Sequence, residues 1–217
     1  MFRRILSHLT KNNQSSRRAS YSLKSDTTGG HRNSLLLIDT SPSMNETDWP
    51  PSRLGGALES ASAYLAQLAQ EDPDACIAVV QYASTAKITV PLTQCRYAEA
   101  IQNQFWRIRT GFMTNITSGL KAAYNICSRC HGTNQVVLLS DGFHNLGPNP
   151  RRISDKLKEY ATIECVGIGG SPTSVDEKLM MYIASSRADG TKRYRWIGKK
   201  EVLVQHFREL ALGLARS

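Results

Sequence analysis

Short, nearly continuous apolar runs alternate along the chain with longer segments in which apolar residues recur every three or four positions. Continuous runs are typical of strands covered on both faces, and the longer spacing is typical of helices that bury one face. The runs predict strands at residues 34–39, 76–82, 136–139, 163–168 and 194–197, and residues 86–92 alternate like an edge strand paired with 76–82. The helical spacing predicts helices at residues 54–68, 97–108, 116–127, 153–160, 175–183 and 203–214.

This order of elements indicates an α/β fold. Strands that alternate with helices build a mostly parallel sheet with helices on both faces. We therefore expect a six-stranded sheet in which residues 86–92 form one antiparallel edge strand. In open sheets of this kind, ligands bind outside the carboxyl ends of the strands. The rule predicts a ligand site among three loops: the loop after Asp39, the loop around Thr114 and the loop after Asp141.

Side chains with oxygen donors gather in these three loops. Asp39, Ser41 and Ser43 follow the first strand, Thr114 precedes a helix, and Asp141 follows the strand at 136–139. Carboxylates and hydroxyls, without imidazole or thiol, are the donors that a hard cation such as Mg²⁺ prefers. Because hydroxyl ligands are neutral, the ion would keep net positive charge and an exchangeable position, which a partner's carboxylate could fill.

Taken together, Asp39-x-Ser41-x-Ser43, Thr114 and Asp141-Gly142 resemble the metal-ion-dependent adhesion site (MIDAS) of von Willebrand factor type A (vWA) domains. Residues 77–82 and 138–142 also resemble blocks of this family, and the resemblance covers roughly residues 34–214. It implies a doubly wound, Rossmann-like sheet. It also implies that Ser41, Ser43 and Thr114 ligate Mg²⁺ or Mn²⁺ through their hydroxyls, and that Asp39 and Asp141 ligate it directly or through water.

The resemblance further implies a partner. In this family, a Glu or Asp carboxylate of a partner protein completes the coordination of the metal ion. Among relatives, the chain is most similar to small intracellular bacterial proteins. This similarity implies an adaptor or regulatory subunit that works beside an ATPase or a kinase–phosphatase module.

Two positions depart from the family pattern without removing a ligand. Pro42 and Met113 stand where glycine is common, and the proline stiffens its loop.

Residues 45–51 form a polar loop beside the site, with Glu46 and Asp48. These two acids cover the site, tune the choice of partner or simply belong to a solvated loop.

The net charge of +9 is concentrated at the start of the chain. Residues 1–33 carry seven Lys and Arg side chains against Asp26 alone, a net charge of +6. We expect a disordered basic leader at 1–33 and a vWA-like domain at 34–217. A basic tail can touch nucleic acid, an anionic membrane surface or an acidic protein. The alternative function is therefore a nucleic-acid- or membrane-associated module recruited through the leader, although nucleic acid is the less expected partner.

Length and cysteine usage narrow the class of protein further. A chain of 217 residues suits one α/β domain, and no apolar run reaches the roughly 20 residues of a transmembrane helix. The five cysteines lack the spacing of a disulfide framework, which indicates a reducing compartment. We expect a cytoplasmic protein, or a mitochondrial matrix protein in a eukaryote, because residues 1–25 are rich in Arg and Ser and contain no acid.

The sequence lacks the residues that two classes of enzyme require. A strand-end aspartate is the nucleophile of aspartyl-phosphate phosphotransferases, but these enzymes need a second carboxylate two residues later, where this chain has Ser41. A serine hydrolase needs a G-x-S-x-G elbow and an oriented histidine, which the sequence lacks.

Cys127-x-x-Cys130-His131 matches a haem-attachment pattern, and we interpret it as a structural thiol pair. The sequence therefore predicts a metal-dependent protein-interaction module and no enzyme.

Overall fold

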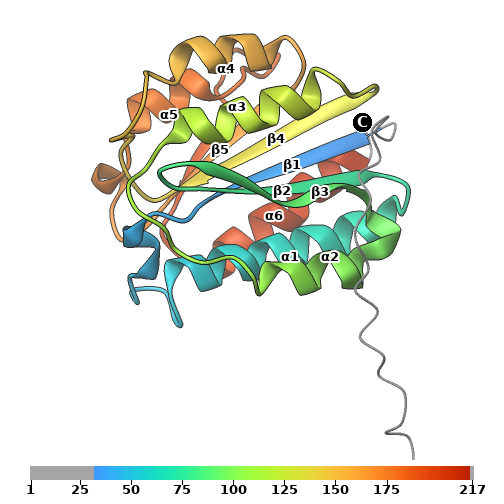
Figure 1. Ribbon diagram of the computed structural model, residues 1–217, viewed down its shortest axis with the longest axis horizontal. Coiled ribbons are helices and arrows are strands. Elements are labelled where there is room, and N and C mark those ends of the chain that lie inside the picture. The colour runs from blue at the N-terminus through green and yellow to red at the C-terminus, as the bar shows by residue number, and fades with distance from the viewer. Residues whose placement is uncertain (1–31, 216–217) are drawn as a thin grey trace, which may run out of the picture.

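A six-stranded sheet lies at the centre of the molecule in the computed structural model, which describes residues 32–215 (Figure 1). The strand order is β3-β2-β1-β4-β5-β6, and every neighbouring pair is parallel except β2 and β3, which are antiparallel. The predicted α/β fold with one antiparallel edge strand is confirmed. The strands are β1 (Arg32–Asp39), β2 (Cys76–Tyr82), β3 (Ala86–Gln94), β4 (Thr133–Ser140), β5 (Thr162–Ile168) and β6 (Tyr194–Ile197).

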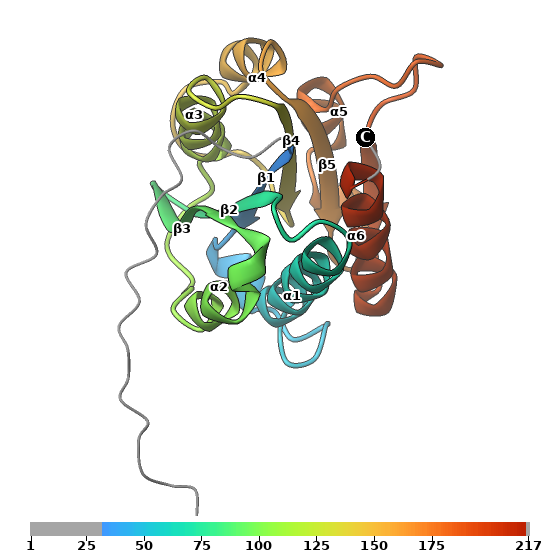
Figure 2. The same ribbon diagram turned by 90° about the vertical axis from the view of Figure 1, so that its right-hand side faces the viewer.

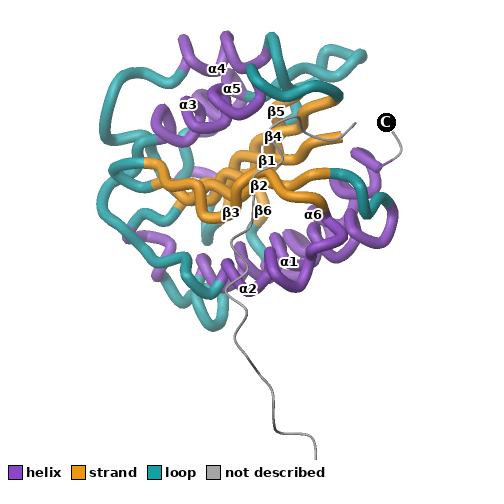
Figure 3. Tube along the Cα trace, turned by 45° about the vertical axis from the view of Figure 1, so that its right-hand side comes forward, coloured by secondary structure: helices purple, strands orange, loops and turns teal. Residues whose placement is uncertain are grey.

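Helices cover both faces of this sheet, as the tube view of Figure 3 shows. One face carries α1 (Arg53–Glu71), α2 (Ala98–Phe105) and α6 (Lys200–Ala215). The other face carries α3 (Ile116–Cys127), α4 (Arg151–Lys158) and α5 (Glu177–Ile183). Within residues 32–215, no helix is both long enough and apolar enough to cross a bilayer.

Some element boundaries differ from the expectation. The helix predicted at 97–108 is shorter, because the chain makes a 3-10 turn at Cys95–Tyr97 before α2 and α2 ends at Phe105. β1 begins at Arg32, two residues before the expected start of the domain. Asn33 is fully buried there and donates a hydrogen bond to Asn134 Oδ1 at 3.0 Å. The rest of the predicted leader, residues 1–31, lies outside the described residues.

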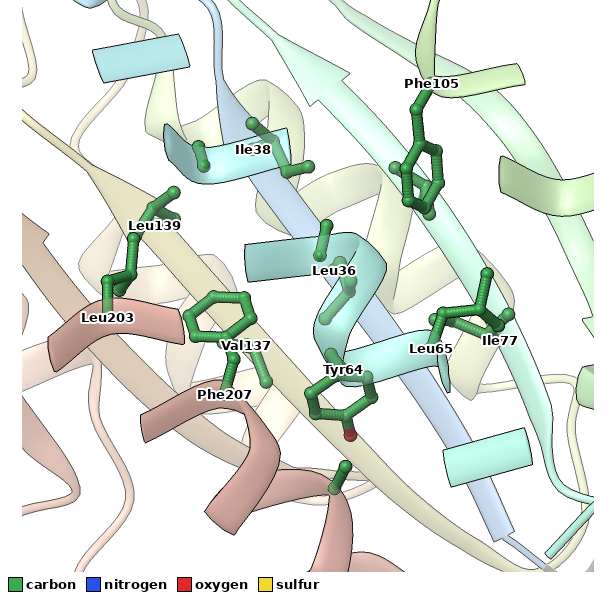
Figure 4. Packing of buried hydrophobic residues seen from close by; sticks show 14 of the residues in the cluster. Leu36, Ile38, Tyr64, Leu65, Ile77, Phe105, Val137, Leu139, Leu203 and Phe207 are labelled. Atoms are coloured by element: carbon green, nitrogen blue, oxygen red, sulfur yellow. The ribbon is translucent and has the colours of Figure 1, made fainter. Parts of the chain in front are cut away.

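The core lies on both faces of β1. Leu36 and Ile38 pack on the side of α1 and α6, whereas Leu35 and Leu37 pack on the side of α3 and α5. This two-sided burial explains why the strand reads as a continuous apolar run. Figure 4 shows the core on the side of α1 and α6 from close by. There the ring of Tyr64 on α1 packs edge to face against the ring of Phe207 on α6, with 6.1 Å between the ring centroids.

The direction of winding reverses between β1 and β4. From β1 the chain proceeds to β2 and then β3 on one side, and β4, β5 and β6 follow on the other (Figure 2). Ile38 and Leu139 are partners in the parallel β1–β4 register, so the carboxyl ends of the two strands lie side by side. Such a topological switch point is where open α/β sheets leave a crevice for ligands. Asp39 and Asp141 flank it.

A buried hydrogen bond between α1 and β1 offers a test of the packing. Ser34 Oγ donates to the Tyr64 hydroxyl at 2.8 Å, and that hydroxyl lies 3.3 Å from its acceptor, Gln135 Oε1. Tyr64→Phe should lower the free energy of unfolding by about 1–3 kcal/mol, because buried polar groups lose their partner. In urea unfolding, Tyr64→Phe combined with Ser34→Ala should cost less than the sum of the single changes, and strict additivity would contradict the coupling.

Candidate metal site

The turn that follows β1 supplies the first part of the site. Asp39 is fully buried at the end of the strand, and its Oδ1 accepts a hydrogen bond from the Ser41 backbone N–H at 2.8 Å. Pro42 opens a short 3-10 turn, η1 (Pro42–Asn45), because its fixed φ suits the first position of a helical turn. The turn places Ser43 beside Ser41, with 3.1 Å between their hydroxyl oxygens. Residues 39–43 thus fold locally into a cluster of oxygen donors.

The segment at the end of β4 closes the cluster from the other side of the switch point. Ser43 Oγ donates to Asp141 Oδ1 at 2.8 Å. The second oxygen of each carboxylate is held by another residue: Ser140 Oγ donates to Asp39 Oδ2 at 2.7 Å, and Arg53 Nη1 donates to Asp141 Oδ2 at 3.1 Å. Hydrogen bonds therefore join four of the five predicted ligand residues into one cluster.

Thr114, the fifth predicted ligand, is buried on the neighbouring loop. Its backbone N–H donates to Asn145 Oδ1 at 2.7 Å, and its carbonyl accepts from the Asn145 N–H at 3.0 Å. The loop is also seated against the end of β1, because the Gly111 N–H donates to the Thr40 carbonyl at 2.6 Å. A Cβ at Gly111 would lie 2.8 Å from Ala83 Cβ, so this approach requires glycine. Thr114 therefore lies at the same edge, although its hydroxyl forms no hydrogen bond with any described residue.

Burial sets the electrostatics of the site. Burial, and next the charge of Asp141, raise the pKa of Asp39 to about 7 despite the hydrogen bonds that Asp39 accepts. Burial also raises the pKa of Asp141, while hydrogen bonds from Ser43 and Arg53 act in the opposite direction. Two carboxylates that repel each other inside a protein carry a free-energy cost, and a bound cation relieves it.

Arg53 is the main residue of the site that sequence reasoning missed. It is the first residue of α1, it is buried, and it binds three acids. Its Nε lies 2.9 Å from Asp48 Oδ1, its Nη2 lies 2.6 Å from Glu46 Oε2, and its Nη1 contacts Asp141. Burial lowers the pKa of Arg53, but Asp48 and Asp141 raise it by more, so the guanidinium stays charged. The one signal in the sequence is an arginine at a helix start that follows an acidic loop.

The acidic loop has a structural explanation in these contacts. Glu46 and Asp48, interpreted from sequence as cover for the site or as a solvated loop, are ion-pair partners of Arg53. The hydrogen bond from Arg53 lowers the pKa of Asp48. Ser140 was also missed, and its only signal is its place directly before Asp141 at the end of a strand.

The donor set suits a hard divalent cation. Asp39 and Asp141 each direct one oxygen toward groups of the serine turn, and every other polar side chain in the cluster, apart from Arg53, is a hydroxyl. Oxygen donors without nitrogen or sulfur favour Mg²⁺ or Mn²⁺. Within residues 32–215, no group of three or more His, Cys, Asp and Glu side chains could hold a metal ion. A cation at this edge would therefore depend on the hydroxyls of Ser41, Ser43 and Thr114.

Removing the charge of Asp39 tests the electrostatic cost. The folded-state pKa of about 7 exceeds the ordinary value of 3.8, so ionisation of Asp39 destabilises the fold as the pH rises between these values. In chelator at pH 8, Asp39→Asn should raise the free energy of unfolding by on the order of 1–4 kcal/mol, since one pKa unit corresponds to about 1.4 kcal/mol. Thermal unfolding should show a smaller gain at pH 5. Equal gains at both pH values would contradict this account.

Replacing Arg53 tests its role as a built-in cation. In chelator, Arg53→Gln should lower the free energy of unfolding by about 3–5 kcal/mol, as when a buried ion pair loses one partner. Added Mg²⁺ should then stabilise the variant more than the wild type, because the metal no longer competes with a guanidinium. Arg32→Gln, which breaks the pair with Asp72, is the matched control and should cost about 1 kcal/mol or less with an unchanged metal response. A weaker Mg²⁺ response in Arg53→Gln would instead make Arg53 essential for orienting Asp141.

Comparisons with known proteins identify the family and the fold of this domain. The model of the von Willebrand factor type A domain family matches residues 35–195. Complement C2 from Bos taurus is 25% identical over 210 residues, which cover 83% of this chain and 27% of that protein. The solved structure of a von Willebrand factor type A protein from Catenulispora acidiphila has a TM-score of 0.72 at 22% identity and covers 84% of this chain and 42% of that chain. Proximal thread matrix protein 1 from the mussel byssus, solved with a zinc-occupied MIDAS motif, has a TM-score of 0.69 at 20% identity and covers 87% of this chain and 48% of that chain.

These likenesses bear on the domain and not on a longer protein's activity. The chain spans 27–36% of the length of the first curated relatives it matches. At 20–22% identity, the two solved structures named above establish the fold of this chain and nothing about its function. The family match, by contrast, begins within β1, ends within β6 and contains β2 to β5 in full. The chain therefore belongs to the von Willebrand factor type A domain family.

Proposed function

We propose that this domain is a metal-dependent protein-interaction module. Mg²⁺ or Mn²⁺ is held by Asp39, Ser41, Ser43, Thr114 and Asp141, and a Glu or Asp carboxylate of a partner protein completes its coordination. The observation that carries the proposal is the hydrogen-bonded oxygen cluster at the β1–β4 switch point. The mussel byssus protein with zinc at its MIDAS motif supports the view that this fold can hold a divalent cation there.

The residues of this chain determine how strongly the bound ion attracts a partner. Three of the proposed ligands are neutral hydroxyls, and Arg53 balances part of the charge of Asp141. An ion in this setting keeps much of its positive charge, which is the chemistry that the metal supplies for capturing a carboxylate. Ser140 and the Ser41 N–H hold Asp39 in place. We propose that the site binds and does not catalyse, because Ser41 stands where a phosphotransferase needs an acid.

The cellular setting is part of the proposal. None of the five cysteines, all of which are described, is in a disulfide, and four of them are buried. This supports a reducing compartment, and we propose an intracellular adaptor or regulatory subunit beside an ATPase or a kinase–phosphatase module. Recruitment of nucleic acid or a membrane through the basic leader is the competing function, and it would not depend on a metal ion.

Thermal unfolding of the full chain tests the metal site. A ligand that binds only the folded state stabilises it by about 2.7 kcal/mol at a hundredfold excess over its Kd, which corresponds to roughly 5–10 °C for a domain of this size. We expect this shift with Mg²⁺ or Mn²⁺ relative to chelator. Asp39→Ala should abolish it. Glu159→Ala, which removes an exposed acid at the end of α4, is the control and should keep it. No shift in the wild type at millimolar metal would refute the proposed site.

A further inference from the structure

Three large apolar side chains are exposed on the two loops that carry Thr114 and Asp141. Phe112 is 80% exposed, Met113 is 44% exposed and Phe143 is 52% exposed. The first two directly precede Thr114, and Phe143 follows Asp141-Gly142. Hydrogen bonds between Thr114 and Asn145 join the loops, so all three side chains belong to the rim of the candidate metal site. Large exposed apolar side chains on loops that border a polar site are a feature typical of interaction surfaces.

The backbone holds this rim in a defined position. Ser84 Oγ donates to the Phe112 carbonyl at 2.6 Å, and the Gly111 N–H donates to the Thr40 carbonyl. Met113 adopts a φ of +57°, a left-handed conformation that non-glycine residues rarely adopt. The fold therefore keeps a strained residue with an exposed side chain where glycine would relieve the strain. Strain of this kind concentrates at functional sites.

The segments around the rim carry positive charge and no acids apart from Asp141. Residues 100–140 and 142–154 contain no Asp or Glu, and the exposed Arg107, Arg109, Arg151 and Arg152 lie in the segments next to the two loops. The nearby acids of the η1 side, Glu46 and Asp48, are bound to Arg53. An acidic segment would thus approach the site without meeting an uncompensated acid on these loops.

We propose that Phe112, Met113 and Phe143 form an apolar rim that selects a partner segment in which the metal-binding Glu or Asp is flanked by bulky apolar residues. This inference rests on the proposed function and names its partner chemistry. The carboxylate approaches the ion, and neighbouring aliphatic or aromatic side chains of the partner cover the two rings. Exposed aromatic side chains are the usual anchors of such contacts.

Selection from a displayed random dodecapeptide library tests the rim. The immobilised full chain is loaded with Mg²⁺, washed and eluted with chelator. We expect the eluted peptides to be enriched in Glu or Asp with aromatic or aliphatic neighbours. For one selected peptide, Phe112→Ser and Phe143→Ser should each weaken binding roughly tenfold, as expected for burying a large apolar group. Tyr97→Ser is the matched control and should leave the Kd unchanged. Tyr97 is 54% exposed and lies just after β3, near the amino end of β2, whereas the candidate site lies at the carboxyl ends of the parallel strands.

Met113→Gly separates recognition from stability. Glycine accepts the positive φ, so the unfolding midpoint should stay unchanged or rise. Loss of the side chain should nevertheless weaken peptide binding several-fold. A variant that binds the peptide as tightly as the wild type would remove Met113 from the rim.

The outcomes distinguish this inference from the function beneath it. If metal fails to shift the unfolding midpoint, the proposed function falls and the inference falls with it. If metal shifts the midpoint but the eluted peptides are acidic without apolar neighbours, only the inference is overturned. The same holds if both phenylalanine variants bind normally or if the metal-loaded chain retains no peptide. Metal-dependent dimerisation that is lost in Phe112→Ser would assign the rim to self-association and also overturn the inference.

Discussion

Two buried carboxylates at one edge of the sheet are the constraint around which this end of the molecule is organised. Asp39 and Asp141 follow neighbouring parallel strands at the switch point, where the doubly wound fold brings chain segments 98 residues apart into contact. Burial and mutual repulsion make their ionised state costly. The surrounding residues offset this cost by donating hydrogen bonds to both oxygens of each carboxylate, from Ser41, Ser43, Ser140 and Arg53.

Arg53 shows how the fold manages this charge with its own residues. A guanidinium can serve several carboxylates at once, and here it contacts Asp141 inside and Glu46 and Asp48 on the outside. Glu46 and Asp48 therefore supply the carboxylates that pair with this buried, charged guanidinium on its outer side. Arg53 is the first residue of α1, and α1 packs against α6 through Tyr64 and Phe207. The position of the Arg53 side chain in the site therefore depends on how these two helices pack on the sheet.

The fold could be read from the sequence because its signals are local and repeated. Continuous runs such as Cys76–Tyr82 and the helical stripe of Ile116–Cys127 give the same bounds in the structure, since two-sided burial and one-sided burial impose different periods.

The candidate site could be predicted in part, because the fold brings the strand ends together and the spacing of the motif identifies the hydroxyls and carboxylates. The contact of Arg53 with Asp141 could not, because it joins side chains 88 residues apart and depends on how α1 meets the sheet edge. The start of β1 at Arg32 was missed for a similar reason: polar Asn33 is buried through a partner, Asn134, that lies 101 residues away.

In the proposed function, the same arrangement would set a balance between holding a metal ion and attracting a partner. Every negative charge added among the ligands would tighten the hold on the cation and reduce its pull on an incoming carboxylate. The proposed ligands of this chain include two carboxylates, and Arg53 offsets part of the charge of one of them. The acid-free segments 100–140 and 142–154 extend that bias outward, so an anion would be favoured on its approach to the site before any contact with the ion. Charge alone would accept many acids, and discrimination among them then falls to side chains that do not touch the metal. The proposed apolar rim of Phe112, Met113 and Phe143 would serve that discrimination, because these residues share their loops with Thr114 and Asp141.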